Sequence, residues 1–144
     1  MTPRLKTILL EQTVSAPLDE VYRAFTNASA LREWFCDLAT VFPKPGGRLY
    51  LWWHGGYYAC GEYLSITPKR ALSFTWRGRS DDRSTRVKVQ LIHKSGGVLV
   101  RLAHVIPINR KWQGRPANFE QEWRSALDNL RSVLEEGIDL RLAN

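Results

Sequence analysis

Two titratable side chains, His104 and Glu62, are the candidates for proton chemistry in this chain. His104 shares the parity of Val98, Val100 and Leu102 along a predicted strand, so its imidazole should face inward with these apolar side chains. Imidazole titrates near neutral pH, which suits a proton carrier or a ligand contact. A buried histidine with satisfied hydrogen bonds is the other interpretation, and the sequence leaves both open.

Glu62 lies in a predicted strand and shares the parity of Tyr58 and Leu64. In a regular strand we expect this parity to face inward, where burial raises the pKa of a carboxylate unless a cation pairs with it. A β-bulge at Gly61 would reverse the register and place the carboxylate in water. An inward-facing Glu62 could form an acid–base pair with His104, although no feature of the sequence brings the two within hydrogen-bond reach.

Aromatic side chains are the second group of candidates, because apolar area supplies most of the affinity of a small-molecule site. Trp123 lies on the apolar stripe of a predicted helix, where core packing and cavity lining are both open interpretations. Trp112 lies in a predicted loop beside Lys111 and Arg115, which could gate a cavity, bind an acidic headgroup or be an ordinary solvated loop. The candidate ligand-binding residues are Trp34, Tyr58, Glu62, Trp76, His104, Trp112 and Trp123.

Several other chemistries have no motif in the sequence. There is no nucleophile elbow, no phosphate-binding loop and no metal-ligand spacing around His54, His93 or His104. Cys36 and Cys60 lack CxxC spacing, which favours two reduced, mostly buried thiols over a disulfide or redox pair. We therefore expect no cofactor and no metal, and we assign no catalytic residue.

Length and composition predict one globular domain over residues 1–144, with a core over about 5–137. The net charge of +7 comes mostly from scattered arginines, and no nucleic-acid-binding motif accompanies it, so we expect no nucleic-acid partner. No signal-peptide pattern and no apolar run of about 18 residues are present. We expect a cytoplasmic protein without a membrane partner.

The pattern of apolar residues predicts an α+β fold. A strand over 5–14 precedes a helix that starts at Ala16-Pro17, where proline suits the first turn, and a helix over 28–34 capped by Asn27 or Ser29. Turn residues at the short connections make the following strands antiparallel. These six strands are predicted near 37–42, 48–54, 57–66, 71–77, 85–93 and 98–105.

A long amphipathic helix over 116–137 is predicted to follow the last strand. Gly137 is a typical C-terminal cap, and residues 138–144 are expected to fray. A long helix that lies across a strongly curved sheet encloses space between them, which suits an apolar molecule. The apolar stripe of the helix is formed by Phe119, Trp123, Leu127, Leu130 and Leu134.

Five segments followed by His104 and Trp123 carry a family resemblance over about residues 8–137. The segments are Ala16-Pro17-Leu18-Asp19-Glu20-Val21-Tyr22, Leu31-Arg32-Glu33-Trp34-Phe35, Gly46-Gly47-Arg48-Leu49, Gly61-Glu62-Tyr63-Leu64-Ser65-Ile66-Thr67-Pro68 and Leu72-Ser73-Phe74-Thr75-Trp76. In this order they resemble the START/Bet v1-like (SRPBCC) superfamily, in the branch related to the Hsp90 ATPase activator homologue. The resemblance implies a helix-grip fold, in which a curved antiparallel sheet wraps around a long C-terminal helix.

The resemblance implies that a small hydrophobic or aromatic molecule binds in a cavity between the sheet and the C-terminal helix. A cyclase- or hydrolase-like enzyme that uses Glu62 and His104 in the same cavity is one alternative. An Hsp90-activator-like interaction module is another, but the eukaryotic co-chaperone has an additional N-terminal domain for which this chain has no room. We therefore do not expect Hsp90 contact.

Trp52 and Trp53 are neighbours on a predicted strand, so their side chains should point to opposite faces of the sheet. One of them would face the cavity and the other would lie on the outer face. An exposed tryptophan suggests a partner surface. A homodimer that covers the outer tryptophan is the hypothesis that follows.

Overall fold

The computed structural model describes residues 4–142, which form a single seven-stranded antiparallel sheet and three α-helices. The strand order across the sheet is β1-β7-β6-β5-β4-β3-β2, so β1 and β2 are the edge strands. The strands are β1 (Leu5–Val14), β2 (Leu38–Val41), β3 (Arg48–Trp52), β4 (Tyr58–Thr67), β5 (Ala71–Gly78), β6 (Thr85–Lys94) and β7 (Gly97–Pro107). The helices are α1 (Leu18–Thr26), α2 (Ala28–Trp34) and α3 (Arg115–Glu136), with 3₁₀ turns at Arg110–Trp112 and Leu140–Leu142.

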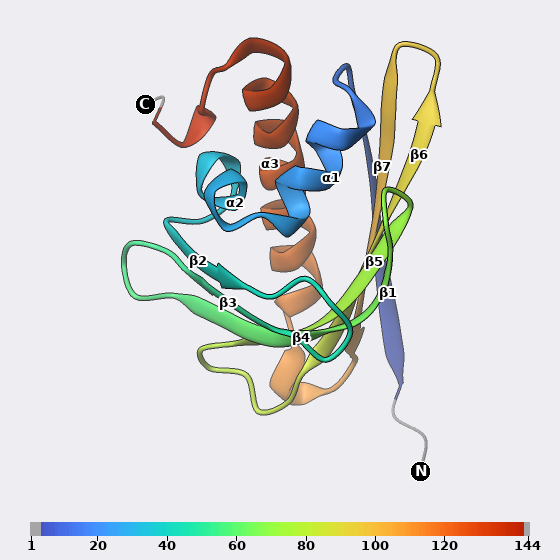
Figure 1. Cartoon of the computed structure of the whole chain (residues 1–144). Coiled ribbons are helices and arrows are strands. Elements are labelled where there is room, and N and C mark those ends of the chain that lie inside the picture. The colour runs from blue at the N-terminus through green and yellow to red at the C-terminus, as the bar shows by residue number, and fades with distance from the viewer. Residues whose placement is uncertain (1–3, 143–144) are drawn as a thin grey trace.

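The sheet curves around α3, which runs through its concave side (Figure 1). Strands β2, β3 and β4 cover one flank of the helix, and β1, β7 and β6 cover the other. The short helices α1 and α2 lie beside the C-terminal half of α3. The predicted α+β helix-grip fold is therefore confirmed. No helix within residues 4–142 is long and apolar enough to cross a membrane.

The apolar stripe of α3 explains why this helix docks in the sheet. Phe119, Trp123, Leu127 and Leu130 are all buried, as predicted, and Leu134 is half-buried. Gly137 ends the helix with φ 71°, a left-handed conformation that favours glycine, and its N–H bonds to the last turn. Trp123 lies on this stripe near the middle of the helix and faces the sheet.

The N-terminal helices also follow their local sequence signals. Pro17 precedes the first turn of α1, and Asp19 and Glu20 lie in that turn, where the helix dipole favours negative charge. The side chain of Asn27 accepts a hydrogen bond of 3.0 Å from the N–H of Ala30 and so caps α2. Asn27, rather than Ser29, is the cap. This arrangement brings Trp34, at the end of α2, against α3.

The expected fraying of residues 138–144 is wrong for residues 138–142, and residues 143–144 lie outside the described part of the chain. Arg141 donates hydrogen bonds of 3.0 Å to the carbonyl of Cys36 and 2.8 Å to that of Arg32, and it pairs with Asp139 at 2.9 Å. The amide of Asn129 donates to Asp139 at 3.0 Å. The segment after α3 is therefore tied to α2 by side-chain hydrogen bonds.

Both cysteines are free thiols, as favoured from the sequence. Cys36 is buried at the end of α2, and burial raises the pKa of its thiol to about 12. Cys60 is half-buried on β4. A thiol with so high a pKa is protonated at neutral pH, so Cys36 is an inert packing residue.

Candidate ligand-binding pocket

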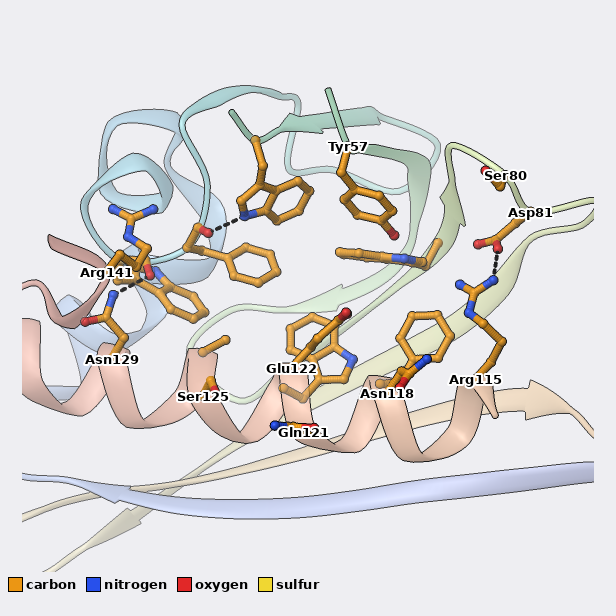
Figure 2. Close-up of a pocket in the computed structure, with 17 residues that line it drawn as sticks. Tyr57, Ser80, Asp81, Arg115, Asn118, Gln121, Glu122, Ser125, Asn129 and Arg141 are labelled. Carbon is orange, nitrogen blue, oxygen red and sulfur yellow. Dashed lines mark hydrogen bonds and ion pairs between the residues drawn. The ribbon is translucent and has the colours of Figure 1, made fainter. Parts of the chain in front are cut away.

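A pocket of about 750 Å³ lies along one side of α3, within the size range of small-molecule sites. Figure 2 shows Arg115, Glu122, Ser125 and Asn129 along α3 on one side of this pocket, and Tyr57, Ser80 and Asp81 on the other. The aromatic residues that line the pocket are called the aromatic wall below. They are Trp34, Phe35, Trp53, Tyr57, Trp76, Phe119 and Trp123.

Phe35 is the centre of the aromatic wall. Its ring stacks on Trp34 at a centroid distance of 4.9 Å and on Trp123 at 5.3 Å, and it meets Trp53 edge-on at 5.2 Å. The Trp53 indole N–H donates a hydrogen bond of 2.6 Å to the carbonyl of Phe35. Stacked and edge-on pairs of this kind add about 0.5–1.5 kcal/mol each beyond area burial. The wall is therefore a preformed, mutually supported surface.

The space between the sheet and α3 is filled largely by these rings. A second void of only about 20 Å³ lies behind them, lined by core residues of α1, α2 and the sheet. Trp34, Phe35 and Trp123 border both the pocket and this void. They separate the open pocket from the dry core, so the accessible volume lies at the side of α3 rather than deep beneath it.

An ion pair between a buried carboxylate and a part-buried guanidinium closes one end of the pocket. Arg115 Nη1 donates to Asp81 Oδ1 at 2.6 Å, and Asp81 Oδ2 accepts from the backbone N–H of Gly78 at 2.8 Å. The Asp81 side chain is 1% exposed. The Arg115 guanidinium also lies over the rings of Trp112 and Phe119, at 4.9 and 4.7 Å from their centroids. At this end of the pocket the charges of Asp81 and Arg115 neutralise each other, and the two rings hold the guanidinium in place.

His104 lies behind the aromatic wall in a fully satisfied hydrogen-bond chain. The Trp123 indole N–H donates to His104 Nδ1 at 3.0 Å, which assigns the proton of the imidazole to Nε2. His104 Nε2 then donates to Thr85 Oγ1 at 2.7 Å, and the Thr85 hydroxyl donates to the carbonyl of Trp76 at 3.1 Å. No lone pair or proton of the imidazole is left for a ligand.

Burial keeps His104 neutral. It lowers the pKa of the imidazole from 6.5 to about 3, and the nearby Arg115 guanidinium acts in the same direction. A group with this pKa does not exchange a proton near neutral pH. His104 is therefore the satisfied buried histidine of the two interpretations, and it acts by orienting Trp123.

Strand β4 presents a different face to the core from the one expected. Ala59 and Tyr63 are buried and point inward, so Tyr58 and Glu62, which have the opposite parity, point outward. Tyr58 stacks on Tyr50 at 5.9 Å, and Glu62 is exposed. Neither residue lines the pocket, which corrects their placement.

The bulge that could have reversed this register lies elsewhere. The pairing of β4 with β5 shifts between Tyr63 and Ser65, after Glu62 rather than at Gly61. A Cβ at Gly61 would overlap the carbonyl oxygen of Thr75, so a glycine is needed for the close approach of the two strands. With Glu62 outside and His104 inside, the structure does not form the acid–base pair.

Of the other candidates, Trp34, Trp76 and Trp123 line the pocket. Trp112 is buried beneath Arg115 and supports the end of the pocket from behind. The indole N–H of Trp76 is buried and makes no hydrogen bond within residues 4–142. Burial raises the pKa of the Tyr57 hydroxyl. The nearby Trp76 indole N–H favours the ionised hydroxyl and offsets only part of this rise.

The candidates drawn from the sequence did not include the pocket residues Phe35, Tyr57 and Glu122. The sequence left open which of Trp52 and Trp53 faces the pocket, and Trp53 does. Trp53 and Tyr57 flank the turn at Gly55 and Gly56, both with positive φ, which folds their rings together at 5.4 Å. The run Trp53-His54-Gly55-Gly56-Tyr57, with an aromatic residue on either side of a glycine turn, could have pointed to them. No grouping of His, Cys, Asp and Glu within residues 4–142 could hold a metal ion.

The comparisons with known proteins place this geometry in a family. The sequence profile described as "Activator of Hsp90 ATPase homolog 1-like protein" matches residues 15–135. The chain belongs to this family. No curated protein matches it in sequence.

Several solved structures share the fold of this chain. CalU16 from Micromonospora echinospora superimposes with a TM-score of 0.78 at 24% identity, covering 96% of this chain and 80% of CalU16. The Aha1 dimer from Colwellia psychrerythraea gives 0.80 at 19%, covering 92% and 98%. DynU16, from the dynemicin biosynthetic locus, gives 0.81 at 19% and covers 91% of this chain, which spans about half (48%) of DynU16. These likenesses show the shared fold.

Proposed function

We propose that this protein, as a single domain over residues 1–144, binds a small apolar or aromatic molecule in the pocket beside α3. The observation that carries the proposal is the preformed aromatic wall around an open volume of about 750 Å³. Members of this fold family bind hydrophobic ligands, which agrees with such a wall. A rigid wall loses little conformational freedom on binding, so burial of apolar ligand area is retained as affinity.

Binding is favoured over catalysis by the positions of the titratable groups. His104 has no free hydrogen-bonding atom, and Glu62 is exposed on the outer face of β4. The cyclase- or hydrolase-like alternative required both groups in the cavity. No observation in residues 4–142 points to Hsp90 contact. A cytoplasmic location stays a prediction.

Native mass spectrometry of the purified protein, followed by extraction of the denatured sample, tests whether a small molecule is retained. A titration with the fluorescent neutral probe N-phenyl-1-naphthylamine tests the pocket directly. Ser125 lines the pocket and is exposed, so Ser125→Trp should fill the volume and weaken probe binding about tenfold or more. Arg124→Trp, one residue along on the same helix and outside the pocket, is the matched control.

We expect the Arg124→Trp variant to bind the probe as the wild type does. Equal probe affinity in wild type and Ser125→Trp, in folded proteins with unchanged circular dichroism, would place binding elsewhere. Absence of probe binding by the wild type, together with an empty native spectrum, would contradict the proposed function itself.

We also propose a homodimer through the outer face of β2, β3 and β4. Trp53 lines the pocket, whereas Trp52 and Tyr58 lie half-buried on the outer face beside Tyr50, which is 41% exposed. The structural neighbour from Colwellia psychrerythraea is a dimer. Light scattering should give twice the monomer mass, and Tyr50→Glu should return the monomer; a monomeric wild type at about 100-fold above working concentration would refute the dimer.

A further inference from the structure

Some charged groups around the pocket have a partner of opposite charge and one does not. Arg115 is paired with Asp81, and Arg141 is paired with Asp139. Glu122 also lines the pocket, yet it forms no ion pair and no side-chain hydrogen bond within residues 4–142. The unpaired charge at this site is therefore negative, although the chain as a whole carries a net charge of +7.

Glu122 is an exposed residue of α3 whose side chain also lines the pocket. Figure 2 shows its side chain rising from α3 toward the side on which Tyr57 lies. Burial raises the pKa of Glu122, and the Arg115 guanidinium opposes this only in part. The residue as a whole is still exposed, so this carboxylate borders both protein atoms and water on the open side of the pocket.

Aromatic rings surround the same space. Trp53 lies 5.4 Å from Tyr57 and 6.2 Å from Trp76, and Trp76 meets Trp123 at 5.4 Å with the two planes 61° apart. The rings therefore face the volume in different orientations. The faces of aromatic rings are negative, and a cation within about 6 Å of a centroid is attracted by about 0.5–2 kcal/mol.

We infer that the occupant of this pocket is an organic cation, an apolar or aromatic molecule that carries an ammonium group, with Glu122 as its counter-ion and the aromatic wall around it. This inference rests on the proposed function and names the ligand class of the same pocket. Charge complementarity carries it, because an unpaired carboxylate and several aromatic faces share one space.

An anionic ligand has no comparable partner. The Arg115 guanidinium is bound to Asp81 and covered by the rings of Trp112 and Phe119. The Arg141 guanidinium donates to Asp139 and to backbone carbonyls. An anion would also meet the negative faces of the wall and the carboxylate of Glu122, so both interactions would be unfavourable.

A matched pair of probes tests the inference. Benzyltrimethylammonium and neopentylbenzene have the same shape and differ in charge, and each is measured by displacement of N-phenyl-1-naphthylamine. The wild type should bind the cation about tenfold more tightly than its neutral isostere. Glu122→Gln should remove most of this preference and leave neopentylbenzene unaffected. Glu120→Gln, an exposed site on the same helix outside the pocket, should retain it.

The pH dependence of the affinity for the cation gives a second readout. It would not change if Glu122 had only a structural role. Benzyltrimethylammonium keeps its charge at every pH, so any change in affinity reports the protein. A bound cation favours the ionised form of Glu122, so affinity in the wild type should rise with pH across the titration of this carboxyl. Tyr57, Asp81 and Arg115 also face this region, and Glu122→Gln should flatten the profile because it leaves all three in place.

The outcomes separate this inference from the proposed function. If the fluorescent probe binds but the cation binds no more tightly than its isostere, or if Glu122→Gln weakens both equally, the cation inference is overturned and the proposed function stands. Tighter binding of the anionic probe 1-anilinonaphthalene-8-sulfonate than of benzyltrimethylammonium would also overturn it. If no probe binds, both fail.

Discussion

Trp123 donates its indole N–H to His104 Nδ1 at 3.0 Å, and this hydrogen bond joins α3 to β7 behind the aromatic wall. The same imidazole reaches Thr85 on β6 at 2.7 Å. One neutral side chain therefore holds the pocket helix against two strands. The plane of Trp123, on which Phe35 stacks, is set by a buried histidine that no ligand touches.

Replacement of His104 by leucine should destabilise the fold by about 2–4 kcal/mol. The variant leaves the N–H of Trp123 buried without a partner, at about 1–3 kcal/mol, and disturbs close packing around the ring. Urea unfolding measures the loss. His93→Leu, at an exposed position on β6, is the control and should change stability by less than about 0.5 kcal/mol. Equal losses in the two variants would contradict this role.

The pKa of His104 also predicts a pH dependence of stability. The folded-state pKa of about 3 lies below the ordinary imidazole pKa of 6.5, so between these two pH values the unfolded chain binds the additional proton. Stability contributed by neutral His104 is therefore complete above about pH 6.5. It falls as pH decreases toward 3, by at most about 1.4 kcal/mol per pH unit.

The measurement is the difference in unfolding free energy between wild type and His104→Leu at pH 7, 5 and 4. Other titrating groups, including Glu122 with its raised pKa, contribute to both proteins and cancel in this difference. The destabilisation caused by the variant should shrink as the pH falls. A difference that stays constant over this range would show that the imidazole is charged, or exposed, in the folded state.

The fold was largely predictable because its signals are local. The period of α3, the Asn27 cap of α2 and the left-handed Gly137 are each specified within a few residues. The face of β4 that packs on the core was not predictable, because alternation shows which residues share a face of the strand and not which face is buried. Both parities carry apolar residues there, and the fit of Tyr63 into the core decides between them.

The pocket was less predictable than the fold, because it is formed by contacts between residues far apart in the sequence. Alternation predicts that Trp52 and Trp53 point to opposite faces but not which of them faces the pocket, and Tyr57 lies in the turn before β4. Glu122 is next to Trp123 and off the apolar stripe of α3, so its contact with the pocket appears only once the opposite wall is in place. Arg141 bonds to carbonyls more than a hundred residues earlier, which no local pattern could indicate.

Gly61 gives a prediction about the contact between β4 and β5. In Gly61→Ala the new Cβ would overlap the backbone oxygen of Thr75, which cannot rotate away, so we expect a loss of about 2–3 kcal/mol. Gly96→Ala is the control, because that position has φ 83° and open space around it, and strain alone should cost about 1 kcal/mol. Thermal unfolding should rank the two variants in this order, and the reverse order would contradict the close approach at Gly61.

Asp81 and Asp82 allow a comparison of a buried and an exposed ion pair on adjacent residues. The Asp81 side chain, 1% exposed, holds both Arg115 and the N–H of Gly78, whereas Asp82, 42% exposed, pairs with Lys111 at 3.2 Å. Asp81→Ala leaves a part-buried guanidinium and a buried N–H without partners, so we expect a loss of about 2–3 kcal/mol. Asp82→Ala should lower stability far less, because solvent screens this exposed pair.

Chemical denaturation at low and high salt distinguishes the two pairs. Screening should erase the small effect of Asp82→Ala and leave most of the effect of Asp81→Ala, because buried pairs are screened much less than exposed ones. Probe binding supplies a second readout, since Asp81 holds Arg115 at the end of the pocket. Loss of probe affinity in Asp81→Ala, with affinity retained in Asp82→Ala, would show that this ion pair shapes the pocket as well as stabilising the fold. Equal stability losses in the two variants at high salt would mean that Asp81 is as solvated as its neighbour.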